Sequence, residues 1–393
     1  MQSNFNLKLV LGGLLLAGLA ACGGGGGGGS ISGASADSGT LRLALTDAPT
    51  CGYDAVNVTI QKIRVNQSSG ASDTDSGWSE VVLNPVRRIN LLTLTNGVLD
   101  ELGQIPLPTG KYTQLRLVLA DNDGAHPMAN SVVPSGGTET TLKTPSGQQS
   151  GVKADINIDI GPNKMADFVI DFDACKSVVA AGNSAQYLLK PVVSVIPRYV
   201  SGVTGFVDAT LVNGSTSVSL QQGGVVIKAT TPGTNGQFLL QPVAAGTYTL
   251  ALTAPGRTTA IVTNVAVVAD MVTPVNTAVT ALNPPASASG IVNGTAPVET
   301  LVRVLHPLTV GATVEIAGRF VDGSTGSYSN SLVVNAPLVA PYVAAPGLLV
   351  FAADTTTAGK YTLSASLTGF SDKVTMLSTL TAGATVTTNL TFP

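Results

Sequence analysis

Apolar and polar residues alternate over short stretches along most of the chain after residue 40. Segments 41–46 and 56–60 alternate with a period of two. This period predicts β-strands, because successive side chains of a strand point to opposite faces of a sheet. The alternation changes phase at Gln61 and Lys62, which predicts a β-bulge there.

A short motif of glycine, any residue, tyrosine and threonine recurs at 110–113, 246–249 and 359–362. The glycine suits a tight turn into a strand, and the tyrosine can bury its ring while its hydroxyl group meets a backbone partner, as at the corners of β-sandwiches. Segments 244–280 and 357–392 also match each other along their length, which predicts a duplicated domain.

These patterns predict an all-β protein of tandem β-sandwich domains after a signal peptide and a flexible tether. The proline-rich segment 283–287 is typical of a linker, because consecutive prolines interrupt strand pairing. The expected organisation is a signal peptide at 1–21, a lipidated cysteine with a Gly/Ser-rich linker at 22–39, and β-sandwiches at 40–197, 201–281 and 288–393.

Composition excludes some functions. Charged residues make up 11% of the 393 residues and the net charge is -3, without the clustered lysines and arginines of a nucleic-acid binder. The two histidines, His126 and His306, lie in different predicted domains, and no nucleophile motif stands out. We therefore expect no nucleic-acid partner and no enzyme activity.

The N-terminal segment has the form of an export signal. Lys8 precedes an apolar run, 9–21, that is too short to span a bilayer as a helix. Residues 19–22, Leu-Ala-Ala-Cys, resemble the lipobox of bacterial lipoproteins, which implies cleavage before Cys22 and its lipidation. The alternative is an ordinary signal peptide with an incidental cysteine.

Seven glycines, 23–29, follow Cys22. With the small residues up to 39 they predict a flexible tether with a reach of ~20–25 Å. By resemblance to lipoproteins of Gram-negative bacteria, Gly23 implies the outer membrane. The expected partners are thus the membrane, through the lipid anchor, and an envelope glycan or protein.

Two known domain types resemble the rest of the chain. The unit at 202–281 resembles the carboxypeptidase regulatory-like domain, a prealbumin-like β-sandwich, through 202–205, 235–238, 246–248 and 256–257. The last unit resembles it more weakly and carries a Val/Ala/Pro-rich insertion near 330–346.

The unit at 40–197 resembles the bacterial lipoprotein family DUF4382, whose members have no assigned activity. The resemblance is carried by 45–49, 56–60, 77–78, 90–97, 107–112 and 171–173.

Cys51 and Cys175 remain once Cys22 is lipidated. Two cysteines in one exported domain usually pair, and closing so long a loop contributes about 4–5 kcal/mol at most. A catalytic or metal role would need a nearby histidine, and none lies close to either cysteine in sequence.

Segments 155–160 and 167–173 read as the two strands of a hairpin joined by a turn at 161–164. One face would then gather four carboxylates, which calcium could neutralise. The alternative is a solvated acidic face relieved by Lys153 and Lys164. The candidate calcium ligands are Asp155, Asp159, Asp167 and Asp171.

Trp78 is the best single candidate for a glycan platform, although packing in the core competes with that role. Asp47 is expected to cap the turn that follows it. The sequence thus predicts a lipid-anchored envelope protein with a structural, adhesive or recognition role, and, as an alternative, a carbohydrate-binding protein that depends on calcium.

Overall fold

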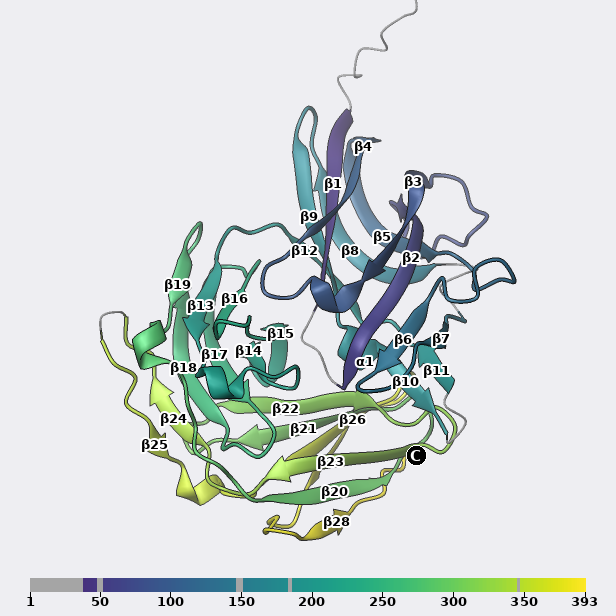
Figure 1. Cartoon of the computed structure of the whole chain (residues 1–393). Coiled ribbons are helices and arrows are strands. Elements are labelled where there is room, and N and C mark those ends of the chain that lie inside the picture. The colour runs from purple at the N-terminus through teal and green to yellow at the C-terminus, as the bar shows by residue number, and fades with distance from the viewer. Residues whose placement is uncertain (1–37, 48–51, 146–150, 183–185, 345–346) are drawn as a thin grey trace, which may run out of the picture. The chain divides into compact units, whose positions relative to one another are not determined.

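The computed structural model describes residues 38–47, 52–145, 151–182, 186–344 and 347–393. Within them the chain is almost entirely β, as expected, and its apolar side chains form three large separate cores. We call the parts around these cores the first, second and third sandwiches (Figure 1). Residues 36–393 form one compact unit.

The first sandwich has two sheets within the described residues. The smaller sheet contains, in spatial order, β12 (Val193–Pro197), β9 (Met165–Phe172), β1 (Ser38–Asp47) and β4 (Asp100–Pro108). The larger runs β10 (Val178–Ala181), β11 (Gln186–Leu189), β7 (Thr140–Lys143), β6 (Ser131–Pro134), β2 (Tyr53–Asn66), β5 (Gly110–Leu119) and β8 (Val152–Ile160), with β3 (Ser79–Asn90) also paired to β2. Two short helices, η1 (Leu91–Thr93) and α1 (Ala174–Ser177), connect strands.

The second sandwich packs a three-stranded sheet against a larger one. The first holds β16 (Gln237–Leu240), β13 (Gly202–Phe206) and β19 (Val272–Pro274). The other runs β15 (Val225–Thr230), β14 (Ser217–Gln222), β17 (Gly246–Thr253) and β18 (Ala260–Val267), and continues into β24 (Leu338–Pro341) and β25 (Ala352–Ala353). The helical turns are η2 (Ala209–Leu211) and η3 (Ala278–Thr280).

The third sandwich repeats this strand order. Its sheets are β23 (Ser327–Val333), β20 (Ser289–Thr295) and β28 (Thr385–Thr387), and β22 (Thr313–Phe320), β21 (Leu301–Pro307), β26 (Thr362–Ser366) and β27 (Lys373–Met376), with η4 (Thr355–Thr357) before β26. In both sandwiches the fifth strand along the chain pairs with the second, β17 with β14 and β26 with β21, when the inserted strands β24 and β25 are not counted. The shared topology explains the match between segments 244–280 and 357–392.

The insertion predicted near 330–346 contains β24, which lies between β23 and β26 in sequence but pairs in parallel with β18 of the second sandwich. A strand of one sandwich therefore extends the sheet of another. Pairing also covers the backbone groups of β18, which would otherwise form an open sheet edge.

Two local predictions are confirmed. The pairing of β2 with both neighbours shifts register between Ile60 and Lys62, as the bulge required. The three motif tyrosines are buried, and the hydroxyl groups of Tyr112 and Tyr248 donate to the carbonyl oxygens of Pro108 and Ala244, each four residues upstream. No described helix is long and apolar enough to cross a membrane.

His306 lies in the interior of the third sandwich, fully buried. Its Nε2 is 2.9 Å from the carbonyl oxygen of Thr357, and its ring centroid is 4.7 Å from that of Tyr361. Burial lowers the pKa of His306, although the contact with Thr357 opposes the shift. The folded protein therefore holds this imidazole in its neutral form more strongly than the unfolded chain does.

We expect the free energy of unfolding to fall as the pH drops below about 6.5, because the unfolded chain binds a proton there more readily than the folded one. Replacing His306 with Gln, which keeps a donor for Thr357, should flatten this decline between pH 8 and pH 5. Denaturant titrations at each pH measure it, with exposed His126→Gln as the control. Equal slopes in the wild type and His306→Gln would contradict the assignment.

Candidate functional site

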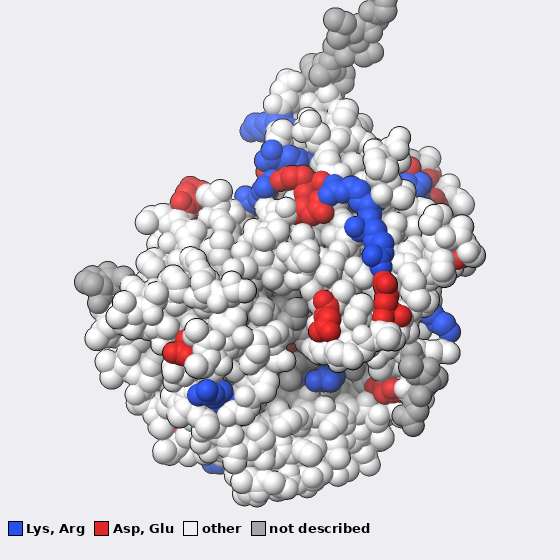
Figure 2. Space-filling view, viewed as in Figure 1, with Lys and Arg blue, Asp and Glu red and all other residues white. Residues whose placement is uncertain are grey.

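A cleft of about 1040 Å³ lies where the three sandwiches meet. All three contribute to its lining, and the surface in Figure 2 is hollowed there, while charged side chains gather mainly over the first sandwich. Hydroxyl and amide groups dominate its polar lining, including those of Ser215, Ser217, Thr295, Ser329 and Asn389. Such groups donate and accept hydrogen bonds without carrying charge.

Glu315 of β22 joins the sandwiches at the wall of this cleft. Its carboxylate is 3.0 Å from Lys176 Nζ of the first sandwich and 2.7 Å from Arg303 Nε of its own sheet. Its backbone N–H donates to Gln221 Oε1 of the second sandwich at 2.6 Å, and its carbonyl oxygen accepts from Gln221 Nε2 at 2.9 Å. The Glu315 side chain is only 5% exposed.

Local sequence places Lys176 where it can reach Glu315. Asp173 follows β9 and accepts a hydrogen bond from the backbone N–H of Lys176, so that it caps the start of α1. Burial alone would lower the pKa of Lys176, but the charges of Asp173 and Glu315 raise it. Lys176 is therefore held as a cation between two carboxylates.

A second contact joins the first and third sandwiches at the same cleft. Asp322 accepts backbone hydrogen bonds from Thr325, Ser324 and, across the interface, Gly182. Although its burial opposes the shift, these donors hold the pKa of Asp322 well below its usual range. The loop that carries Asp322 is thus tied to the first sandwich by an ionised side chain.

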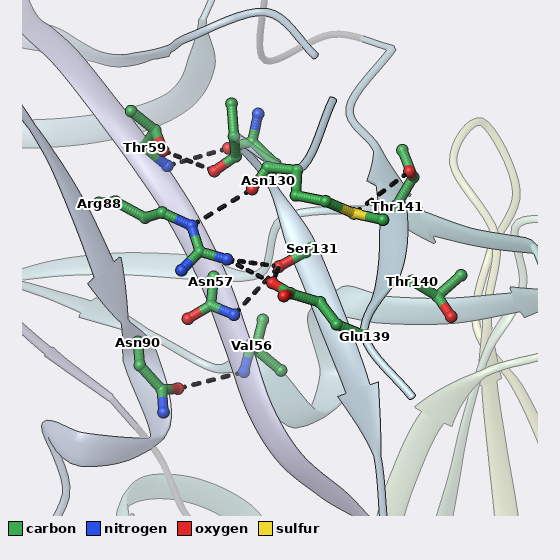
Figure 3. Close-up of polar contacts among 12 residues, drawn as sticks. Val56, Asn57, Thr59, Arg88, Asn90, Asn130, Ser131, Glu139, Thr140 and Thr141 are labelled. Carbon is green, nitrogen blue, oxygen red and sulfur yellow. Dashed lines mark hydrogen bonds and ion pairs between the residues drawn. The ribbon is translucent and has the colours of Figure 1, made fainter. Parts of the chain in front are cut away.

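A separate polar cluster lies on the larger sheet of the first sandwich (Figure 3). Ser131 Oγ accepts from Arg88 and Asn57 at 2.9 and 3.0 Å and donates to Glu139 Oε1 at 2.5 Å. These bonds, with the adjacent charge of Arg88, lower the pKa of Glu139, which makes its carboxylate a weak base. The cluster therefore ties β2, β3 and β6 to the β6–β7 connection rather than activating Ser131.

The prediction that residues 155–173 form a hairpin is wrong. β8 lies at the edge of the larger sheet beside β5, whereas β9 lies between β1 and β12 in the smaller sheet. The turn at 161–164 carries the chain from one sheet to the other. The pattern did not reveal this, because the parallel neighbour of β9 is β1, more than a hundred residues earlier.

The four candidate calcium ligands are consequently not brought together. Asp155 and Asp159 are exposed on β8. Asp167 pairs with Arg42 of β1 and lies 3.9 Å from Arg198, and Asp171 is 3.0 Å from Lys228 Nζ of the second sandwich. Among the described residues no group of three or more His, Cys, Asp or Glu could hold a metal ion.

Trp78 is half-buried beside β3. Its Nε1 donates to the carbonyl oxygen of Ser72 at 2.9 Å, and the guanidinium groups of Arg64 and Arg116 lie 4.5 and 4.8 Å from its ring. Cation–π contacts therefore already use this ring. A glycan at Trp78 stays a prediction.

The turn after Asp47, which this residue is expected to cap, lies outside the described residues. Asp47 Oδ1 accepts from the backbone N–H of Ala174, at the start of α1, at 2.9 Å. Cys175 is the next residue of the same helix. Cys22 and Cys51 lie outside the described residues, so lipidation and the disulfide stay predictions.

Sequence reasoning missed the residues that join the sandwiches. Glu315 and Lys228 each sit in a short apolar strand, Thr-Val-Glu-Ile and Val-Ile-Lys-Ala. A charge inside such a run signals a buried partner, but the run alone does not identify the partner.

Residues 38–191 match the family model of a domain of unknown function, DUF4382. This confirms the resemblance of the first sandwich to that family. No curated protein matches the chain.

Solved structures share only remote similarity. A mutant cohesin–X-dockerin complex of Acetivibrio cellulolyticus is 25% identical over 22% of this chain and 59% of its own, with a TM-score of 0.19. The Bacillus anthracis TIE protein is 11% identical over 91% of this chain and 51% of its own, with a TM-score of 0.18. The Corynebacterium diphtheriae major pilin SpaA is 10% identical over 90% and 99%, with a TM-score of 0.17. The chain thus spans less than two thirds of the first two proteins.

Replacing Glu315 with Ala should lower the free energy of unfolding by about 3 kcal/mol, because it leaves the largely buried cations Lys176 and Arg303, which are 17% and 18% exposed, without their shared partner. Denaturant unfolding followed by circular dichroism measures the loss.

The control is Glu299→Ala. Glu299 also links the first and third sandwiches, through Lys190 at 3.1 Å, but its side chain is 69% exposed. An exposed pair contributes less than about 1 kcal/mol. Equal losses in the two variants would show that burial of Glu315 has no special effect.

Proposed function

We propose that this protein is a lipid-anchored protein of the cell envelope that recognises a surface ligand and catalyses no reaction. The observation that carries the proposal is the cleft between three joined sandwiches. Glu315 and Asp322 join the sandwiches at its wall, and hydroxyl and amide groups make up most of its polar lining. A preformed polar cleft suits binding, because little ordering is needed when a ligand enters.

The ligand class that fits this lining is a glycan of the envelope. Sugar hydroxyl groups both donate and accept hydrogen bonds, as do the hydroxyl and amide side chains of the cleft. Arg319 is exposed at the cleft and can donate to several sugar oxygens at once. A segment of an envelope protein is the alternative ligand, and it would engage the same groups through its backbone.

The anchor in this proposal is a diacylglyceryl group on Cys22, with residues 23–39 as the tether. Two or more acyl chains give stable membrane attachment, because each buried methylene contributes about 0.8 kcal/mol. We place the protein at the outer membrane of a Gram-negative bacterium, on the basis of Gly23.

We also propose that the first sandwich carries a Cys51–Cys175 disulfide. In support, Cys175 lies in α1 of the first sandwich, to which Cys51 belongs in sequence, and two cysteines of one exported domain usually pair. The carboxypeptidase regulatory-like assignment of the second sandwich rests on its sequence motifs, and we extend it to the third sandwich because the two share a strand order.

Replacing Cys22 with Ser should abolish incorporation of labelled fatty acid and release the protein from the membrane fraction. Metabolic labelling followed by membrane sedimentation measures both. The control is Cys175→Ser, which should keep the label. Labelling that persists in Cys22→Ser would refute the anchor.

Residues 36–393, which form the compact unit, should bind an envelope polysaccharide saturably. Replacing Arg319 with Ala should weaken binding about tenfold, equivalent to roughly 1.4 kcal/mol. Isothermal titration calorimetry measures the affinity, and Lys360→Ala, an exposed change outside the cleft, is the matched control. Binding that is equally strong in Arg319→Ala would place the glycan elsewhere, and hydrolysis of the polysaccharide would contradict a non-catalytic role.

A further inference from the structure

Lys228 and Asp171 form a buried contact between the second and first sandwiches. Lys228 Nζ is 3.0 Å from Asp171 Oδ1, and the two side chains are 2% and 11% exposed. The two atoms meet the distance of an ion pair, yet neither atom has a hydrogen-bond partner. The angles at these two atoms therefore fall outside those of a directed N–H···O hydrogen bond.

A third buried polar group lies within electrostatic range of this pair. Asp47 ends β1 and is level with Phe172, the residue after Asp171, on the parallel strand β9. Asp47 is fully buried, and its Oδ2 has no hydrogen-bond partner. Burial raises the pKa of Asp47 well above its usual range, and the charges of Asp171 and Lys228 both act on it. The site thus combines an amine, a carboxyl group and a buried acid whose pKa is raised.

An ordinary ion pair explains this arrangement poorly. Removing two charges from water costs several kcal/mol for each ion, and the attraction offsets this only when further hydrogen bonds satisfy both groups. Here Asp47 Oδ2, Asp171 Oδ1 and Lys228 Nζ are all buried without such bonds. An amide between Lys228 and Asp171 would remove both charges at once.

We propose that Lys228 and Asp171 form an intramolecular isopeptide bond that covalently joins the second sandwich to the first. The uncharged amine and the uncharged carboxylic acid are the forms of the two groups that react with each other. The contact holds them together, which replaces a bimolecular encounter with an intramolecular one.

The reaction is a condensation that needs no oxidant or other reagent. The lone pair of Lys228 Nζ attacks Asp171 Cγ, a new N–C bond forms, and one C–O bond of the carboxyl group breaks. The nitrogen loses a proton and the departing oxygen leaves as water. Asp47 assists by giving a proton to that oxygen and taking one from the nitrogen.

This inference is independent of the lipid anchor and of the glycan. It concerns how the first two sandwiches stay together when the envelope protein is pulled. The bond would survive reduction and denaturation, whereas an ion pair would not.

Tryptic digestion of the reduced full-length protein tests the bond directly. We expect a branched peptide in which 165–176, containing Asp171, is joined to 199–257, with no cleavage after Lys228. Its mass should be lower than the sum of the separate chains by one water molecule. Separate linear peptides with a free Lys228 amine in the folded wild-type protein would overturn the proposal.

Asp171→Asn gives a second, sharper test. The same amide would form with loss of ammonia instead of water, so the variant should yield a branched peptide identical in mass to that of the wild type. Lys228→Arg should yield linear peptides only. A branched peptide in Lys228→Arg would assign the bond to another lysine and overturn the proposal.

Asp47→Asn tests the assisting acid. We expect the fraction of branched peptide to fall at least tenfold, with circular dichroism spectra that match the wild type. If Asp47→Asn unfolds, Asp47→Glu is used in its place, because it keeps the acid. We then expect the branched peptide to form more slowly than in the wild type but completely. Unchanged branching in folded Asp47→Asn would remove Asp47 from the proposal.

Lys190 and Glu299, an exposed pair 3.1 Å apart, serve as the internal control and should stay unlinked.

Discussion

One buried carboxylate, that of Glu315, sets the relation between the three sandwiches. It is the point at which a lysine of the first sandwich, a glutamine of the second and an arginine of the third converge. Buried ion pairs add little net stability compared with apolar packing. Moving the partners apart is strongly destabilising, however, because each would be left as an unpaired charge in the interior. Their effect here is to fix the orientation of the sandwiches, which contributes to the shape of the cleft between them.

Apolar packing and strand pairing supply the stability that Glu315 does not. Ala251, Ile261, Leu308 and Val314 form a small core between the second and third sandwiches. Beside it, β24 continues the sheet of the second sandwich from an insertion in the third. These contacts are extensive and weakly directional, whereas the ionic contacts are few and specific. The two kinds of contact together hold domains that would otherwise move on a flexible linker.

Features that depend on local periodicity could be predicted from the sequence, whereas features that depend on residues distant in the chain could not. The bulge after Ile60 and the buried motif tyrosines could be predicted, because each rests on neighbours within a few residues. The fate of Asp167 and Asp171 could not, because β9 pairs with β1 and meets β15 rather than β8. Alternation indicates that a strand exists and which face is apolar, but it carries no information about the strand beside it.

Charged residues are scarce in this chain, so the positions of the buried ones are informative. Only 11% of the residues are charged, and three of the four least exposed among the described residues, Glu315, Lys228 and Asp47, lie where sandwiches meet or beside that boundary. Within the cleft, hydroxyl and amide side chains outnumber the charged ones. Recognition by such groups is weak for each contact and depends on many contacts being in place together. The junction and the hydroxyl-rich cleft therefore depend on each other, because only sandwiches held in fixed positions can align many weak donors and acceptors on a single ligand.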